Sequence, residues 1–142
     1  MKRFRLFLYW AITFFIVYLI SVLTSTAWRI FDYNSIFLVI GTVNSPLVFL
    51  FFGWLYFRKQ KHLLLSVRVK IAFYWIVLNV VATVILLKFV YGMSIFVEFS
   101  TQGMLIEAGN FVALLLAGYV ATVHTKLPSF PKAKPPTSPK IS

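Results

Sequence analysis

The sequence has no cysteine, only two histidines and only three acidic residues among its 142 positions. The lack of cysteine excludes disulfide bonds, thiolate metal sites and cysteine nucleophiles. His62 and His124 lie outside the apolar runs, so no histidine pair is placed within the membrane to hold a haem or a metal ion. The acids Asp32, Glu98 and Glu107 lack a partner histidine, a lysine nucleophile or a metal cluster with which to carry out acid-base chemistry. No glycine-rich phosphate loop occurs. We therefore expect neither a catalytic residue nor a metal or other cofactor, and we do not expect an enzyme.

Polar residues as a whole are scarce. Hydrophobic residues make up 61% of the chain and charged residues only 12%, which is typical of a membrane protein and not of a soluble core. The net charge of +11 is high enough to suggest nucleic acid. However, the basic residues form short clusters between apolar runs, and no segment supplies a solvated basic face. The composition therefore predicts the lipid bilayer as a partner and excludes nucleic acid.

Four apolar runs are each about long enough to cross a hydrocarbon layer of ~30 Å as a helix. The small residues Ser25, Thr26 and Ala27 resemble a signal-peptide cleavage site, but the run before them is too long for one and favours an uncleaved anchor. We predict an all-α, polytopic membrane domain over residues 1–125. A proline- and lysine-rich tail over residues 126–142 is predicted to be disordered and cytoplasmic. The predicted helices span residues 6–23, 35–57, 71–90 and 103–123.

The distribution of lysine and arginine predicts the orientation. Cytoplasmic loops are enriched in these residues, and 12 of the 14 fall on one side of the four predicted spans. The stretch Arg58–Lys70 carries five of them, whereas Arg29 and Lys88 stand alone on the other side. Both termini are therefore predicted to be cytoplasmic, in the plasma membrane or, in a prokaryote, the bacterial inner membrane. The basic clusters are also suited to anionic lipids of the inner leaflet.

Two sequence features predict helix packing. Small side chains recur at every fourth position of the last span, which lets another backbone approach closely along that stripe. The neighbour is either a helix of the same chain or a second molecule. In the second span, Pro46 removes a backbone donor and predicts a kink near Thr42. The small residues of the stripe are Gly109, Ala113, Ala117 and Ala121.

Charged and amide side chains near the outer ends of two spans are candidate functional groups. Glu107 and Asn110 are three residues apart and project near the small-residue stripe. A carboxylate in lipid is costly, so Glu107 is either a site that exchanges a proton or cation, or the partner of Lys88 in an ion pair. We expect the ion pair, because the helical rise puts both residues near the outer edge.

Amide side chains also occur deeper in the membrane. Asn44 and Asn79 come out at about 14 and 16 Å from the outer edge by helical rise, so a hydrogen bond between them is expected to stabilise the fold. Thr83 lies one turn from Asn79 on the same face. Together with Thr42 and Ser45, these residues alternatively line a polar pathway beside Pro46.

The residues Arg3–Trp10 and Arg68–Trp75 share a pattern of basic, apolar and aromatic positions. Either a duplicated hairpin or ordinary anchoring at the membrane interface produces this pattern.

Two functions are compatible with these features. The first is a non-enzymatic accessory or regulatory partner of another membrane protein, with the stripe, Glu107 and Asn110 as its contact surface. The second is a carrier or channel for a small solute or ion, whose path along Asn44, Asn79 and Glu107 a homo-oligomer would enclose.

Overall fold

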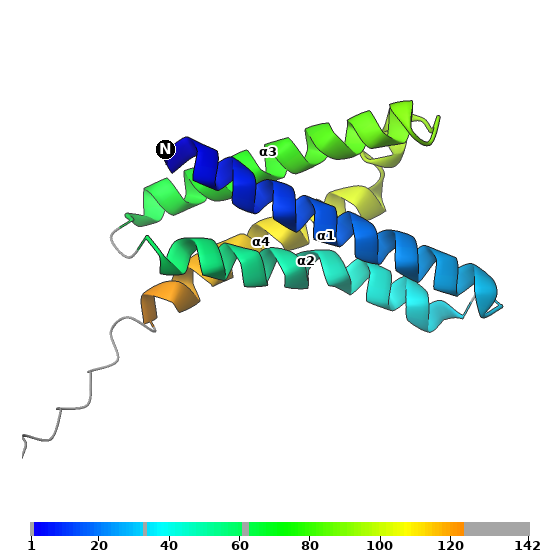
Figure 1. Cartoon of the computed structure of the whole chain (residues 1–142), viewed down its shortest axis with the longest axis horizontal. Coiled ribbons are helices and arrows are strands. Elements are labelled where there is room, and N and C mark those ends of the chain that lie inside the picture. Colours follow the sequence, from blue (N-terminus) through cyan, green and yellow to red (C-terminus); the bar gives the residue numbers. More distant parts are fainter. Residues whose placement is uncertain (1, 33, 61–62, 124–142) are drawn as a thin grey trace, which may run out of the picture.

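The computed structural model describes residues 2–32, 34–60 and 63–123, and over this part of the chain it is helical without strands. It consists of α1 (Lys2–Ile30), α2 (Ser35–Arg58), α3 (Leu65–Phe89), the short 3-10 helix η1 (Ile95–Val97) and α4 (Thr101–Val123) (Figure 1). All four α-helices are long and apolar enough to cross a membrane. The predicted all-α fold with four spans is therefore confirmed. The predicted tail over residues 126–142 lies outside the described residues.

The first and third helices begin earlier than predicted, and α1 also ends later. Residues 24–30, which lie between the predicted spans 6–23 and 35–57, continue α1. Their hydroxyl groups bond within the helix: Thr24 Oγ1 donates to the carbonyl of Ile20 at 2.9 Å, and Thr26 Oγ1 to that of Val22 at 2.8 Å. Polar side chains satisfied in this way do not interrupt a helix. In α3, the turn before Ile71 is helical and includes Arg68, whose side chain bonds to α4.

The helices run up and down, so that the amino terminus and the end of α4 lie at one end of the molecule (Figure 1). We call the opposite end, with residues 30–32, 34–35 and 89–101, the distal end. Short polar residues begin the helices there. Asn34 Oδ1 accepts from the backbone N–H of Ile36 at 3.1 Å, and Ser100 Oγ accepts from that of Gly103 at 3.3 Å. After α3 the chain turns at Gly92, whose φ of +60° suits a residue without a side chain.

The close contact between α2 and α4 forms the centre of the bundle, with α1 packed on α2 and α3 packed on α4. A Cβ atom at Gly53 would lie 2.9 Å from Leu114 Cδ2 and 3.1 Å from Ala117 Cβ. A Cβ atom at Gly109 would lie 3.3 Å from Pro46 Cγ. The small residues of α4 therefore face α2 of the same chain. This confirms the intramolecular interpretation of the stripe, whose residues Ala113, Ala117 and Ala121 are buried.

Pro46 lies inside α2, which remains helical from Ser35 to Arg58. Its ring rests in the space that Gly109 leaves open on α4. The kink predicted near Thr42 stays a prediction, because no break in the helix marks it.

Large aromatic side chains fill the core toward the end opposite the distal end. Trp75 and Phe49 are fully buried and their ring centroids are 6.2 Å apart, while Trp10 and Tyr56 are buried in the same cluster. Arg68 is also buried, although its counterpart in the possible repeat, Arg3, is exposed. The two matching segments therefore share the buried tryptophan but not the environment of the arginine.

Candidate functional site: a cavity between the two helical hairpins

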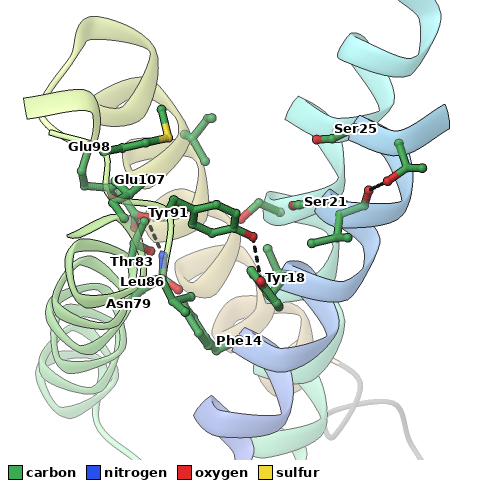
Figure 2. Close-up of a pocket in the computed structure, with 18 of the residues that line it drawn as sticks. Phe14, Tyr18, Ser21, Ser25, Asn79, Thr83, Leu86, Tyr91, Glu98 and Glu107 are labelled. Carbon is green, nitrogen blue, oxygen red and sulfur yellow. Dashed lines mark hydrogen bonds between the residues drawn. The ribbon is translucent and has the colours of Figure 1, made fainter. Parts of the chain in front are cut away.

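A cavity of about 660 Å³ lies in the distal half of the bundle, between α1 on one side and α3, α4 and the connector before α4 on the other (Figure 2). Its walls are mainly apolar, with polar groups concentrated in two places. Serine, threonine and arginine side chains of α1 face it from one wall. The carboxyl groups of Glu98 and Glu107 and the amide of Asn79 face it from the other. The polar lining residues are Tyr18, Ser21, Ser25, Thr26, Arg29, Ser45, Asn79, Thr83, Tyr91, Glu98 and Glu107.

Glu107 is the centre of a hydrogen-bond network that joins three helices. Asn79 of α3 donates its amide N–H to Glu107 Oε1, and Asn110 Nδ2 donates to Glu107 Oε2 at 3.5 Å. Behind them, Ser45 Oγ of α2 donates to Asn110 Oδ1 at 2.9 Å. Asn79, Ser45 and Asn110 are all buried. Two neutral amides thus orient the carboxyl group of Glu107 at the wall of the cavity.

A second carboxyl group adjoins the first. Glu98 follows η1 and lies beside Glu107 in Figure 2. Burial raises the pKa of the Glu98 carboxyl above its ordinary value of 4.5, and the interaction with Glu107 offsets part of this rise. Two carboxyl groups therefore face the same part of the cavity.

Two tyrosines, one from each hairpin, meet across the cavity. The hydroxyl groups of Tyr18 on α1 and Tyr91, just after α3, are 2.7 Å apart, and Tyr91 reaches across the cavity in Figure 2. Tyr91 is half exposed, so the bond lies near the surface. A single hydrogen bond therefore links the two sides at this point.

The ion pair expected between Lys88 and Glu107 is absent from the described part of the chain. Lys88 is exposed and its Nζ lies 6.0 Å from the ring centroid of Phe89, on the next residue of the same chain. Glu107 instead faces inward to Asn79 and Asn110. The expectation was wrong because similar depth in the membrane does not fix which way each helix is rotated.

The prediction of a hydrogen bond between Asn44 and Asn79 is also wrong. Asn79 bonds to Glu107, whereas the Nδ2 atom of Asn44 is buried without a partner. Asn44 is not part of the cavity wall, although Thr83 and Asn79 are. Of the residues in the alternative prediction, Ser45, Asn79 and Thr83 line the cavity and Asn44 and Thr42 do not, and the polar pathway itself stays a prediction.

The structure also corrects the contact surface expected for a partner protein. Asn110, Ala113 and Ala117 are buried against the other helices of the same chain. They are not available to a second protein while the bundle is intact.

Three groups of this site were not singled out from the sequence. Glu98 was considered only as one of the three acids, and Tyr18 and Tyr91 were given no role in a site. No spacing rule connects them with Glu107, because Tyr18 lies on α1 and the loop that follows α3 determines where Tyr91 and Glu98 lie. Arg68 was considered only as a topological charge and as the start of a possible repeat, yet it is buried and donates to the carbonyl of Gly118 and to Thr122 Oγ1.

The arrangement is that of a binding cavity. Predominantly apolar walls with a few convergent polar groups are typical of small-molecule sites. Among the described residues, no group of three or more histidine or acidic side chains is placed to hold a metal ion. The chain matches no protein-family model, no curated protein and no solved structure.

Proposed function

We propose that this protein binds a small amphiphilic molecule in the cavity between its hairpins and serves as a carrier or receptor for it. The observation that carries this proposal is the cavity of about 660 Å³ with one acidic and amide wall. A solute path had been expected to need several copies of the chain. A cavity formed within one chain supports a binding role without that requirement, and nothing in the proposal needs a catalytic group.

A substitution that fills the cavity tests this function. Ser21 lines the α1 wall, whereas Ser66 is exposed near the start of α3 and is not part of the cavity. We expect saturable binding of a fluorescent alkyl alcohol to the purified protein in phosphatidylcholine nanodiscs. Ser21→Phe should weaken it by about tenfold or more, and Ser66→Phe should leave it unchanged. Equal, non-saturable uptake by empty nanodiscs and by all three proteins would contradict the proposal.

A role as an accessory partner of another membrane protein is the second candidate. It is supported by the connector at the distal end, where Phe96 and Phe99 are 76% and 56% exposed. Large exposed apolar groups outside the spans are typical of interaction surfaces. One other membrane protein should then co-purify stoichiometrically in mild detergent, and Phe96→Ser should abolish this. Phe4→Ser, at the opposite end and 72% exposed, is the matched control. Recovery of a second copy of the chain would instead indicate a homo-oligomer.

The proposed orientation places the distal end outside the cytoplasm, with both termini inside, in a plasma membrane or bacterial inner membrane. The support is the position of Arg58, Lys59 and Lys70 at the end opposite the cavity, together with the amino-terminal bases. In this orientation the cavity lies in the outer half of the bilayer.

A further inference from the structure

The cavity contains two acidic side chains that form no ion pair with a described residue. Glu98 and Glu107 are two of the three acids in the sequence, and both line it. The hydrogen-bond partners of Glu107 are the neutral amides of Asn79 and Asn110. A carboxylate held away from water in this way is costly unless a cation or a proton accompanies it.

The geometry of the pair suits a single cation with several N–H donors. The two carboxyl groups come from different elements, α4 and the residue after η1, and lie side by side at the wall (Figure 2). A protonated amine has three donors and no acceptor. It can bond to both carboxyl groups at once, with Thr83 of the same cavity as a further acceptor.

The remaining lining suits an apolar chain. Phe14 and Val17 of α1, Leu86 of α3 and Ile106 of α4 all line the cavity. A ligand with a cationic head and an apolar body would thus place each part against a matching surface. Arg29, in the last turn of α1, lines the same cavity and offers a positive charge to an anionic group on the ligand.

We infer that the cavity selects amphiphiles that carry a protonated amine, with the ammonium group between Glu98 and Glu107 and the apolar chain along α1 and α3. This inference rests on the proposed binding function and adds the chemical class of the ligand. Two kinds of molecule share this chemistry: simple alkylamines, and membrane phospholipids with an amine in the headgroup. The latter also carry a phosphate, for which Arg29 is the available partner.

The test compares three fluorescent probes with the same alkyl chain and an amine, alcohol or sulfate headgroup. The full-length protein is held in phosphatidylcholine nanodiscs at neutral pH, and empty nanodiscs give the background. We expect the amine to bind about tenfold or more tightly than the alcohol, and the sulfate more weakly than both. Glu107→Gln and Glu98→Gln should each reduce amine binding toward that of the alcohol. Asp32→Asn, which removes the third acid outside the cavity, should not.

The outcomes separate this inference from the proposed function. Saturable alcohol binding without a preference for the amine overturns the inference and leaves the binding function intact. No saturable binding of any probe overturns both. If Glu107→Gln does not fold, Glu98→Gln decides the question, because Glu98 lies in the connector outside the spans.

A second arm identifies the source of the amine. A fluorescent phosphatidylethanolamine and the alkylamine are compared in wild type and Arg29→Gln. If Arg29→Gln loses binding of the phosphatidylethanolamine but keeps binding of the alkylamine, the site is assigned to amine-bearing lipids. Unchanged phospholipid binding shows that the amine alone is recognised. Failure of both amines to exceed the alcohol overturns the inference.

Discussion

Single residues determine what the cavity wall presents to a ligand. Glu107 is oriented by the amides of Asn79 and Asn110 and lies beside Glu98, and each of these comes from a different place in the chain. Buried polar groups are costly when they lose a partner, so the energy of this network depends on every member. Asn79 and Asn44 differ in this respect, because Asn79 donates to Glu107 whereas the amide nitrogen of Asn44 has no partner.

Replacing Asn79 with leucine should lower the melting temperature of the protein in detergent. The variant leaves one Glu107 oxygen without its amide donor, at a cost of about 0.6–2 kcal/mol in the free energy of unfolding. Asn44→Leu is the matched control, since the Asn44 amide nitrogen has no partner to lose. Thermal unfolding followed by circular dichroism compares the two variants. Equal losses at both positions would show that the hydrogen bond to Glu107 contributes no more than general polarity.

Glu98 should make stability depend on pH. Burial raises its pKa in the folded protein, so the folded state binds the proton more tightly than the unfolded state does. The stability from this group is fully present below the ordinary pKa of 4.5 and is lost as the pH rises through the raised value. The melting temperature should therefore fall as the pH rises above 4.5 through the raised pKa, and less so in Glu98→Gln. If the melting temperature changes equally with pH in wild type and in Glu98→Gln, other groups cause the pH dependence. Asp32→Asn is the control for the loss of an acid.

At the scale of elements, two devices hold the helices together. Residues without side chains let α2 and α4 approach closely, as at Gly53 and Gly109. A long basic side chain joins α3 to the same partner, because Arg68 reaches the Gly118 carbonyl and Thr122 on α4. The carbonyl groups near the end of a helix carry partial negative charge, which favours a cation there.

Replacing Arg68 with glutamine should weaken the attachment of α3 to α4. Hydrogen bonds from a charged group contribute about 1.5–3 kcal/mol, and the buried guanidinium makes two of them. Lys70→Gln removes the same charge from an exposed position two residues away. We expect a lower melting temperature only in Arg68→Gln. Equal melting temperatures for the two variants would mean that Arg68 contributes to the orientation in the membrane but not to the packing of α3 on α4.

At the scale of the whole molecule, the two hairpins pack through α2 and α4 and leave the cavity between α1 and α3 at the distal end. The opposite end is closed by the aromatic core around Trp75. The bond between Tyr18 and Tyr91 joins the hairpins across the cavity. The aromatic core thus fills one end of the bundle, and the cavity lies at the distal end.

Cysteine labelling should establish which side of the membrane the cavity faces. The natural sequence has no cysteine, so single substitutions give an unambiguous signal. Gln102 is exposed at the distal end and Ser66 is exposed at the other. In intact cells, a membrane-impermeant maleimide should label Gln102→Cys but label Ser66→Cys only after lysis. The reverse pattern would invert the proposed orientation.

The sequence by itself determined the four spans, because apolar runs of this length require a bilayer, and it determined the packing stripe, because helical periodicity aligns Gly109, Ala113, Ala117 and Ala121. It also identified Asn79, Thr83 and Glu107 as unusual polar groups. It placed the first connector too early, because Thr24 and Thr26 look polar until their hydroxyl groups find carbonyls within the helix.

Only the tertiary structure decided which polar groups meet. Helical rise gives the depth of a residue, but the partner depends on how each helix is rotated and which helix is its neighbour. Asn79 therefore bonds to Glu107 and not to Asn44, and Lys88 points away from the acid it was expected to neutralise. The cavity is likewise a property of the assembled hairpins, since its walls come from α1, α2, α3, α4 and a connector far apart in sequence.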